Sequence, residues 1–60
     1  MKQILVKRIS EEKKVVSVMI NGITKGYRTM DFKDDRKMLA AINMFQHKFG
    51  LNDKDIVYNF

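Results

Sequence analysis

The side chains best suited to chemistry in this sequence are one imidazole and two pairs of carboxylates. His47 is the only histidine among 60 residues, and there is no cysteine. Adjacent acids such as Asp34 and Asp35 can share general acid–base work, and the closely spaced Asp53 and Asp55 can hold a cation. Each has a simpler interpretation, since His47 falls on the outer side of a predicted helix, and the acid pairs fall at the start of that helix and in a loop.

No recognisable motif joins these groups into a catalytic or metal site. No nucleophile is placed beside His47, and the ligands for a zinc site are too few. Gly22 and Gly26 are not followed by the G-K-[ST] or G-x-x-G context of a phosphate-binding loop. We therefore expect a non-enzymatic protein that uses no metal, no cofactor and no small-molecule substrate.

The basic side chains offer a different chemistry, the attraction of a polyanion or an acidic protein. Residues 1–33 carry eight Lys or Arg against three acids, whereas residues 34–60 carry four of each, so the net charge of +5 lies entirely in the first part. Such a field attracts nucleic acid or an acidic protein surface. For a nucleic-acid partner, the candidate contacts are Arg8, Lys13, Lys25 and Arg28.

The length of the chain limits the core that can position these groups. A chain of 60 residues buries only about 60% of its unfolded surface, and this one lacks the disulfides or metal that often support small domains. We therefore expect one domain, residues 1–60, that oligomerises as a homodimer. The first residues, MKQILVKRIS, contain too short an apolar run for a signal peptide or membrane span, which favours a cytoplasmic protein with no membrane partner.

Asn21 and Gly22 give the strongest structural signal, because this dipeptide between two apolar runs is typical of a type I′ hairpin turn. The turn pairs Ile20 with Ile23, and regular alternation then sorts the flanking residues onto two faces. The first face, expected to be the core, holds Val16, Val18, Ile20, Ile23 and Tyr27. The second face holds Val15, Ser17, Met19, Thr24, Gly26, Arg28 and Met30.

An earlier strand is predicted over residues 3–9, followed by a polar turn. If Ile9 pairs with Lys14, Leu5 lies on one face while Ile4 and Val6 lie on the other. A one-residue slip or a bulge exchanges these two sets, and the sequence leaves both registers open.

A helix is predicted to begin at Asp31 or Asp34 as the N-cap and to end near Lys48 or Phe49. Gly50 is typical of a left-handed C-terminal cap. The apolar stripe that faces the sheet recurs at helical spacing and contains Met38, Ile42, Phe45 and Phe49, with Ala41 beside it. Residues 55–60, DIVYNF, alternate in polarity and predict a short last strand.

These elements predict an α+β fold in the order β-β-β-α-β: an antiparallel meander, one helix over the first face, and a last strand at an edge. The second face is then left without a cover. Burying its large apolar side chains in a partner would contribute about 1.5 kcal/mol or more for each one. The candidate protein or dimer contacts are Val15, Met19, Met30, Tyr58 and Phe60.

The run V-x-V-x-I-N-G-I-T-K-G-Y-R-T-M-D-F, followed by a helix with Ala40-Ala41 and by Asn59-Phe60, resembles the AP2-type DNA-binding domains and the arm-binding domains of tyrosine integrases. The resemblance covers about residues 3–60. It implies a three-stranded sheet backed by one helix and laid in the major groove of DNA. Arg8, Lys13, Lys25 and Arg28 would then be the contacts.

Short Lys- and Met-rich chains of this kind also resemble phage-encoded proteins that block a host enzyme or defence complex. Two functions are therefore expected. The first is a homodimeric interaction protein that blocks or regulates a protein partner in the host cytoplasm, and the second is a nucleic-acid-binding module that uses the basic side of the sheet. We favour the first, because phosphate contacts give no reason for Val15, Met19 and Met30 to share a face with Arg28.

Overall fold

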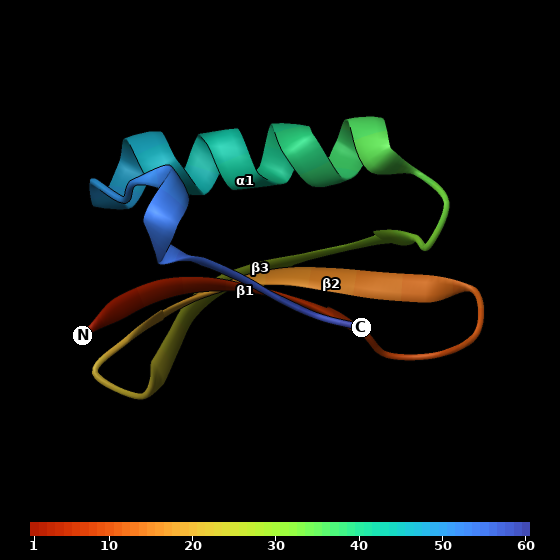
Figure 1. Cartoon of the computed structure of the whole chain (residues 1–60), viewed down its shortest axis with the longest axis horizontal. Coiled ribbons are helices and arrows are strands. Elements are labelled where there is room, and N and C mark those ends of the chain that lie inside the picture. Colours follow the sequence, from red (N-terminus) through yellow and green to blue (C-terminus); the bar gives the residue numbers. More distant parts are fainter.

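The hairpin turn at Asn21 and Gly22 joins two of the four strands that make up the sheet (Figure 1). Both residues have positive φ, 53° and 81°, as a type I′ turn requires. The computed structural model describes residues 1–60. The elements are strands β1 (Lys2–Arg8), β2 (Lys13–Ile20) and β3 (Ile23–Asp31), helix α1 (Asp35–Phe49), the 3₁₀ turn η1 (Asp53–Asp55) and strand β4 (Ile56–Asn59).

The strands form a single sheet in the order β3-β2-β1-β4. β1, β2 and β3 are antiparallel neighbours, whereas β4 pairs with β1 in parallel, so the sheet is mixed. The predicted order β-β-β-α-β and the placement of the last strand at an edge are confirmed. The parallel pair follows from α1, which crosses over one face of the sheet and returns the chain to the β1 edge (Figure 1).

The register of the first hairpin is the one that buries Ile4 and Val6. Arg8 pairs with Lys14, so Ile4 lies opposite Val18 and Val6 lies opposite Val16. Both β1 residues are fully buried and belong to the core under α1. The one-residue slip that the sequence left open is therefore the native arrangement.

A β-bulge in β3 overturns the predicted sorting of residues 26–30. Val18 pairs with Gly26 and Met19 with Thr24, so Lys25 is an extra residue without a partner in β2. Because one extra residue reverses the faces of all that follow it, Met30 packs in the core at 5% exposure, whereas Tyr27 is 68% exposed. The expectation that Tyr27 lies in the core and Met30 beside Val15 is wrong.

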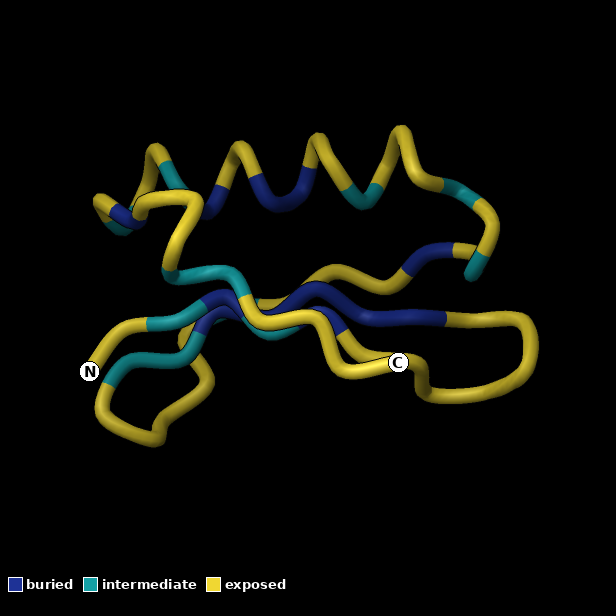
Figure 2. The backbone as a smooth tube through the Cα atoms, in the orientation of Figure 1, coloured by how far each residue is buried: buried dark blue, intermediate teal, exposed yellow.

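Helix α1 has the predicted boundaries and packs its apolar stripe on the sheet. The Asp34 side chain accepts a hydrogen bond of 3.0 Å from the backbone N–H of Lys37, which caps the helix start. Gly50 ends it in the left-handed conformation with φ of 68°. The buried segments of α1 are those that face the sheet (Figure 2), and the core contains Ile4, Val6, Val16, Val18, Met30, Ala41, Ile42, Phe45 and Leu51.

Neither α1 nor η1 combines the length and the apolar character that a membrane-spanning helix requires.

Candidate interaction surfaces

The sheet face opposite α1 has no element packed on it (Figure 1), and we call it the open face. Strand pairing sets Val57, Leu5, Ser17 and Tyr27 side by side in one row across all four strands. Two further rows flank this one. The open face comprises Gln3, Leu5, Lys7, Val15, Ser17, Met19, Thr24, Tyr27, Thr29, Val57 and Asn59.

Apolar and hydroxyl side chains dominate the open face. Tyr27 is 68% exposed and Val57 is 42% exposed, while Leu5 and Met19 are partly buried by their neighbours. Lys7 is the one charged side chain in these rows. A surface depleted of charge at its centre, with an aromatic residue and methionine, has the composition of a protein interface.

An exposed ion pair lies at the edge of the open face, next to the turn between β1 and β2. The ammonium of Lys13 lies 2.6 Å from the Asp31 carboxylate in the pair that ends the β2–β3 ladder. The hydrogen bond, and then the charge, of Lys13 lower the pKa of Asp31, and the same interactions raise the pKa of Lys13. The charges of Lys13 and Asp31 thus form an ion pair with each other.

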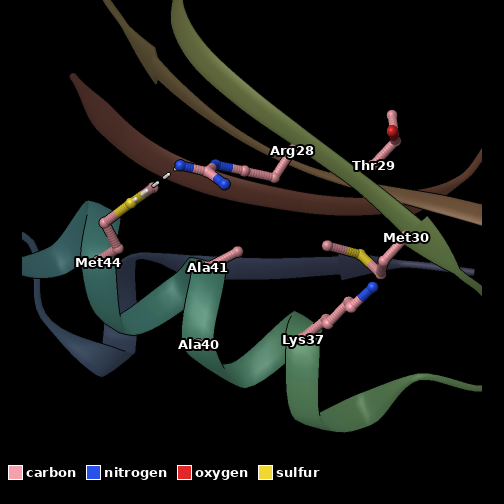
Figure 3. Close-up of a pocket in the computed structure, with 7 residues that line it drawn as sticks. All are labelled: Arg28, Thr29, Met30, Lys37, Ala40, Ala41 and Met44. Atoms are coloured by element: carbon pink, nitrogen blue, oxygen red, sulfur yellow. Dashed lines mark hydrogen bonds between the residues drawn. The ribbon is translucent and has the colours of Figure 1, made fainter.

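A groove of about 360 Å³ lies between β3 and α1, on the other side of the sheet. Arg28 enters it from β3 and Lys37 from α1 (Figure 3). A guanidinium nitrogen of Arg28 contacts Met44 Sδ at 3.7 Å, and neither cation forms a salt bridge. The remaining lining residues are Thr29, Met30, Ala40 and Ala41.

Three aromatic rings meet on the α1 side of the sheet, near the start of the helix. Phe60 packs edge-on against Phe32, with ring centroids 5.4 Å apart, and Tyr58 packs edge-on against Phe60 at 6.1 Å. The Arg8 guanidinium stacks 3.9 Å from the centre of the Phe32 ring. These contacts hold β4 and the loop before α1 together.

The five residues predicted as protein contacts fall in three places. Val15 and Met19 share the open face, although Val15 is only 8% exposed. Met30 is in the core, because the bulge at Lys25 turns it toward α1. Tyr58 and Phe60 are 53% and 62% exposed, but they belong to the aromatic group on the opposite side of the sheet.

The four residues predicted as nucleic-acid contacts do not share a surface. Arg8 stacks on Phe32 and donates to the Ser10 carbonyl oxygen at 3.0 Å. Lys13 pairs with Asp31, Lys25 occupies the bulge, and Arg28 enters the groove under α1. The bulge and the pleat therefore divide the basic residues between both sides of the sheet.

The acids and the histidine lie at the ends of α1 and in η1. Asp34 is the N-cap of α1, and His47 is exposed in its last turn. Asp53 accepts a hydrogen bond from the Gln46 amide at 2.8 Å, and Asp55 accepts one from the Asn52 backbone N–H at 2.9 Å. No group of three or more His, Cys, Asp or Glu residues is arranged to hold a metal ion.

Sequence reasoning missed Leu5, Tyr27 and Val57 on the open face and Lys37 in the groove. The alternation of side chains along β1 and β4 places Leu5 and Val57 on the open face once the strand register is known. The face of Tyr27 depends on the bulge at Lys25, for which Gly26 is the only local signal.

The chain matches no protein-family model, and it matches no curated protein and no solved structure.

Proposed function

We propose that this protein is a non-enzymatic interaction protein that dimerises through the open face and acts by occupying a protein partner. The observation that carries the proposal is the row Val57, Leu5, Ser17 and Tyr27, which crosses the whole sheet without a charge. Contact between the apolar side chains of this row and water is unfavourable, and a second sheet packed about 10 Å away would remove the row from water.

A second copy fits this face better than a polyanion does. Each copy carries a net charge of +5, but only Lys7 contributes to the open face. Two open faces can therefore meet with little direct repulsion, whereas phosphates would find one cation there.

The size of the face sets the expected strength of the dimer. The molecule measures 29 × 20 × 18 Å, so one face is smaller than the roughly 800 Å² that each partner contributes to a standard interface. The dimer is thus expected to be weak and in exchange with monomer at micromolar concentrations.

Sedimentation velocity from about 10 µM to about 1 mM tests the proposal by following the dimer fraction. Tyr27→Asp places a charge in the central row and is expected to abolish the dimer. Tyr58→Asp makes the same change on the opposite side of the sheet and is expected to leave it intact. Circular dichroism confirms that both variants are folded.

A wild-type chain that stays monomeric throughout this range would exclude the dimer. If that monomer binds duplex DNA with an affinity that falls steeply as salt is added, the nucleic-acid function replaces the proposed one.

A further inference from the structure

The groove between β3 and α1 contains two cations, Arg28 and Lys37, that form no salt bridge within the molecule. Arg28 lies between the strand and the helix with only the Met44 sulfur, a weak acceptor, as hydrogen-bond partner. Lys37 makes no ion pair. A guanidinium and an ammonium that both face the same groove can bind carboxylates with charge-assisted hydrogen bonds.

The floor of the groove is apolar and adaptable. Met30 and Ala41 form part of the buried core, with exposures of 5% and 6%, and Ala40 and Met44 lie beside them on α1 (Figure 3). The small alanines leave the space open, while methionine side chains adjust to different occupants. At about 360 Å³, the groove holds a few side chains but no folded domain.

The rim of the groove is a free strand edge. β3 is the outer strand of the sheet and pairs only with β2. Between Gly26 and Asp31 its pairing is regular, because the bulge is confined to the hairpin end. The chain contains no proline that would block strand addition. An extended segment can therefore add to β3 as a fifth strand.

We propose that the β3 edge and this groove bind an extended acidic segment of a partner protein by strand addition. Alternate side chains of the added strand would point into the groove, where carboxylates meet Arg28 and Lys37. The intervening side chains would point to the open face beside Tyr27, which favours apolar residues there. The preferred segment therefore alternates acidic and apolar residues.

The groove suits a peptide better than a nucleic acid. Two cations neutralise few phosphates. The aromatic rings that could stack with bases, Tyr27, Phe32, Tyr58 and Phe60, do not line the groove. The apolar floor and the free edge have no role in phosphate binding, but both are used by an added strand.

This inference rests on the proposed function and identifies the chemistry of the partner. Its test is separate, because peptide binding is measured by fluorescence anisotropy and dimerisation by sedimentation. Arg28→Gln is expected to weaken peptide binding and to leave the dimer fraction unchanged. If the chain binds the peptide but does not dimerise, the homodimer is excluded and the peptide-binding proposal stands.

The probe is a fluorescein-labelled short peptide in which Glu and Val alternate. It is expected to bind about tenfold more tightly than the same peptide with Gln in place of Glu. Arg28→Gln and Lys37→Gln should each weaken binding about three- to tenfold. Lys54→Gln removes one positive charge from η1, away from the groove, and should leave the affinity unchanged.

Amide hydrogen exchange locates the added strand. Peptide binding should slow exchange in Gly26–Asp31 and not in β4, and a proline at the centre of the peptide should abolish binding. Equal weakening by Lys54→Gln, or equal binding of the proline peptide, would overturn the proposal. So would tighter binding of a single-stranded oligonucleotide that is weakened by the Arg28 and Lys37 variants.

Discussion

The ammonium of Lys14 lies 2.9 Å from the carboxylate of Asp35, and this pair links the beginning of strand β2 to the start of α1. The two partners differ sharply in exposure, since the Lys14 side chain is 2% exposed and that of Asp35 is 76% exposed. Lys14 lies opposite Met30 on the α1 side of the sheet. Its hydrocarbon stem thus fills the core, while its nearly buried ammonium meets the exposed carboxylate of Asp35.

Asp35→Asn is expected to destabilise the fold by about 1 kcal/mol, because it leaves the nearly buried ammonium of Lys14 without its partner. Lys14→Met should cost less, since methionine fills a similar volume and Asp35 stays hydrated. Urea unfolding of the two variants gives the comparison. A greater loss in Lys14→Met than in Asp35→Asn would contradict this account, and adding Asp35→Asn to Lys14→Met should change stability little.

The elements that could be predicted from sequence are those with local causes. The turn at Asn21 and Gly22 and the end of α1 at Gly50 depend on backbone conformations that only a few residue types adopt easily. The Asp34 cap depends on a side chain beside its own helix. The order of strands and helix follows from these boundaries.

The faces of residues 26–30 were not predicted correctly, because the only local signal of a bulge is Gly26, and a glycine within a strand marks either a bulge or a close contact with another element. The bulge is favoured by distant packing: it places Met30 in the core and brings Gly26 under Phe45. The contacts of Tyr27, Arg28 and Met30 all depend on it. The bulge therefore separates the predicted positions of these three residues from the observed ones, whereas Tyr58 and Phe60 lie on the α1 side because of how β4 pairs with β1.

A side chain at Gly26 is expected to crowd the core, since a Cβ there would lie 3.2 Å from Phe45 Cε1, which is closer than an ordinary van der Waals contact. Gly26→Val should destabilise the fold by about 1–3 kcal/mol through overpacking. The loss should shrink in a Phe45→Leu background, where the ring no longer occupies that space. Urea unfolding measures both, and Thr29→Val on the same strand is the control, expected to change stability by less than about 0.5 kcal/mol. An equal penalty in both backgrounds would show that Phe45 is not the cause.

The Lys13–Asp31 ion pair is expected to make the stability of the fold depend on pH. The pKa of Asp31 is lowered by Lys13, so the pair stabilises the fold above a pH of about 4 and loses this effect as the pH falls through the lowered pKa. The pKa of Lys13 is raised, so the effect lasts below a pH of about 10.5 and is lost as the pH rises through the raised pKa. Both side chains are exposed, so the effect is small and weakens with salt.

The difference in Tm between the wild type and Asp31→Asn should therefore be present at neutral pH and vanish in strong acid. Lys13→Gln should show the same pattern, and combining the two changes should add little. A difference in Tm that persists unchanged below the lowered pKa of Asp31 would mean that this variant acts through something other than the ion pair.

Deletion of Lys25 tests whether the bulge alone sets the faces of β3. Removing this unpaired residue leaves every β2–β3 pair in place, including Val18 with Gly26 and Lys14 with Met30. The shortened chain should therefore fold with Met30 still buried and lose no more than about 1 kcal/mol. Deletion of Thr29 shortens the chain equally but shifts Met30 toward the open face, and should cost several kcal/mol through the emptied core. Urea unfolding ranks the two deletions, and comparable losses in both would refute the role given to Lys25.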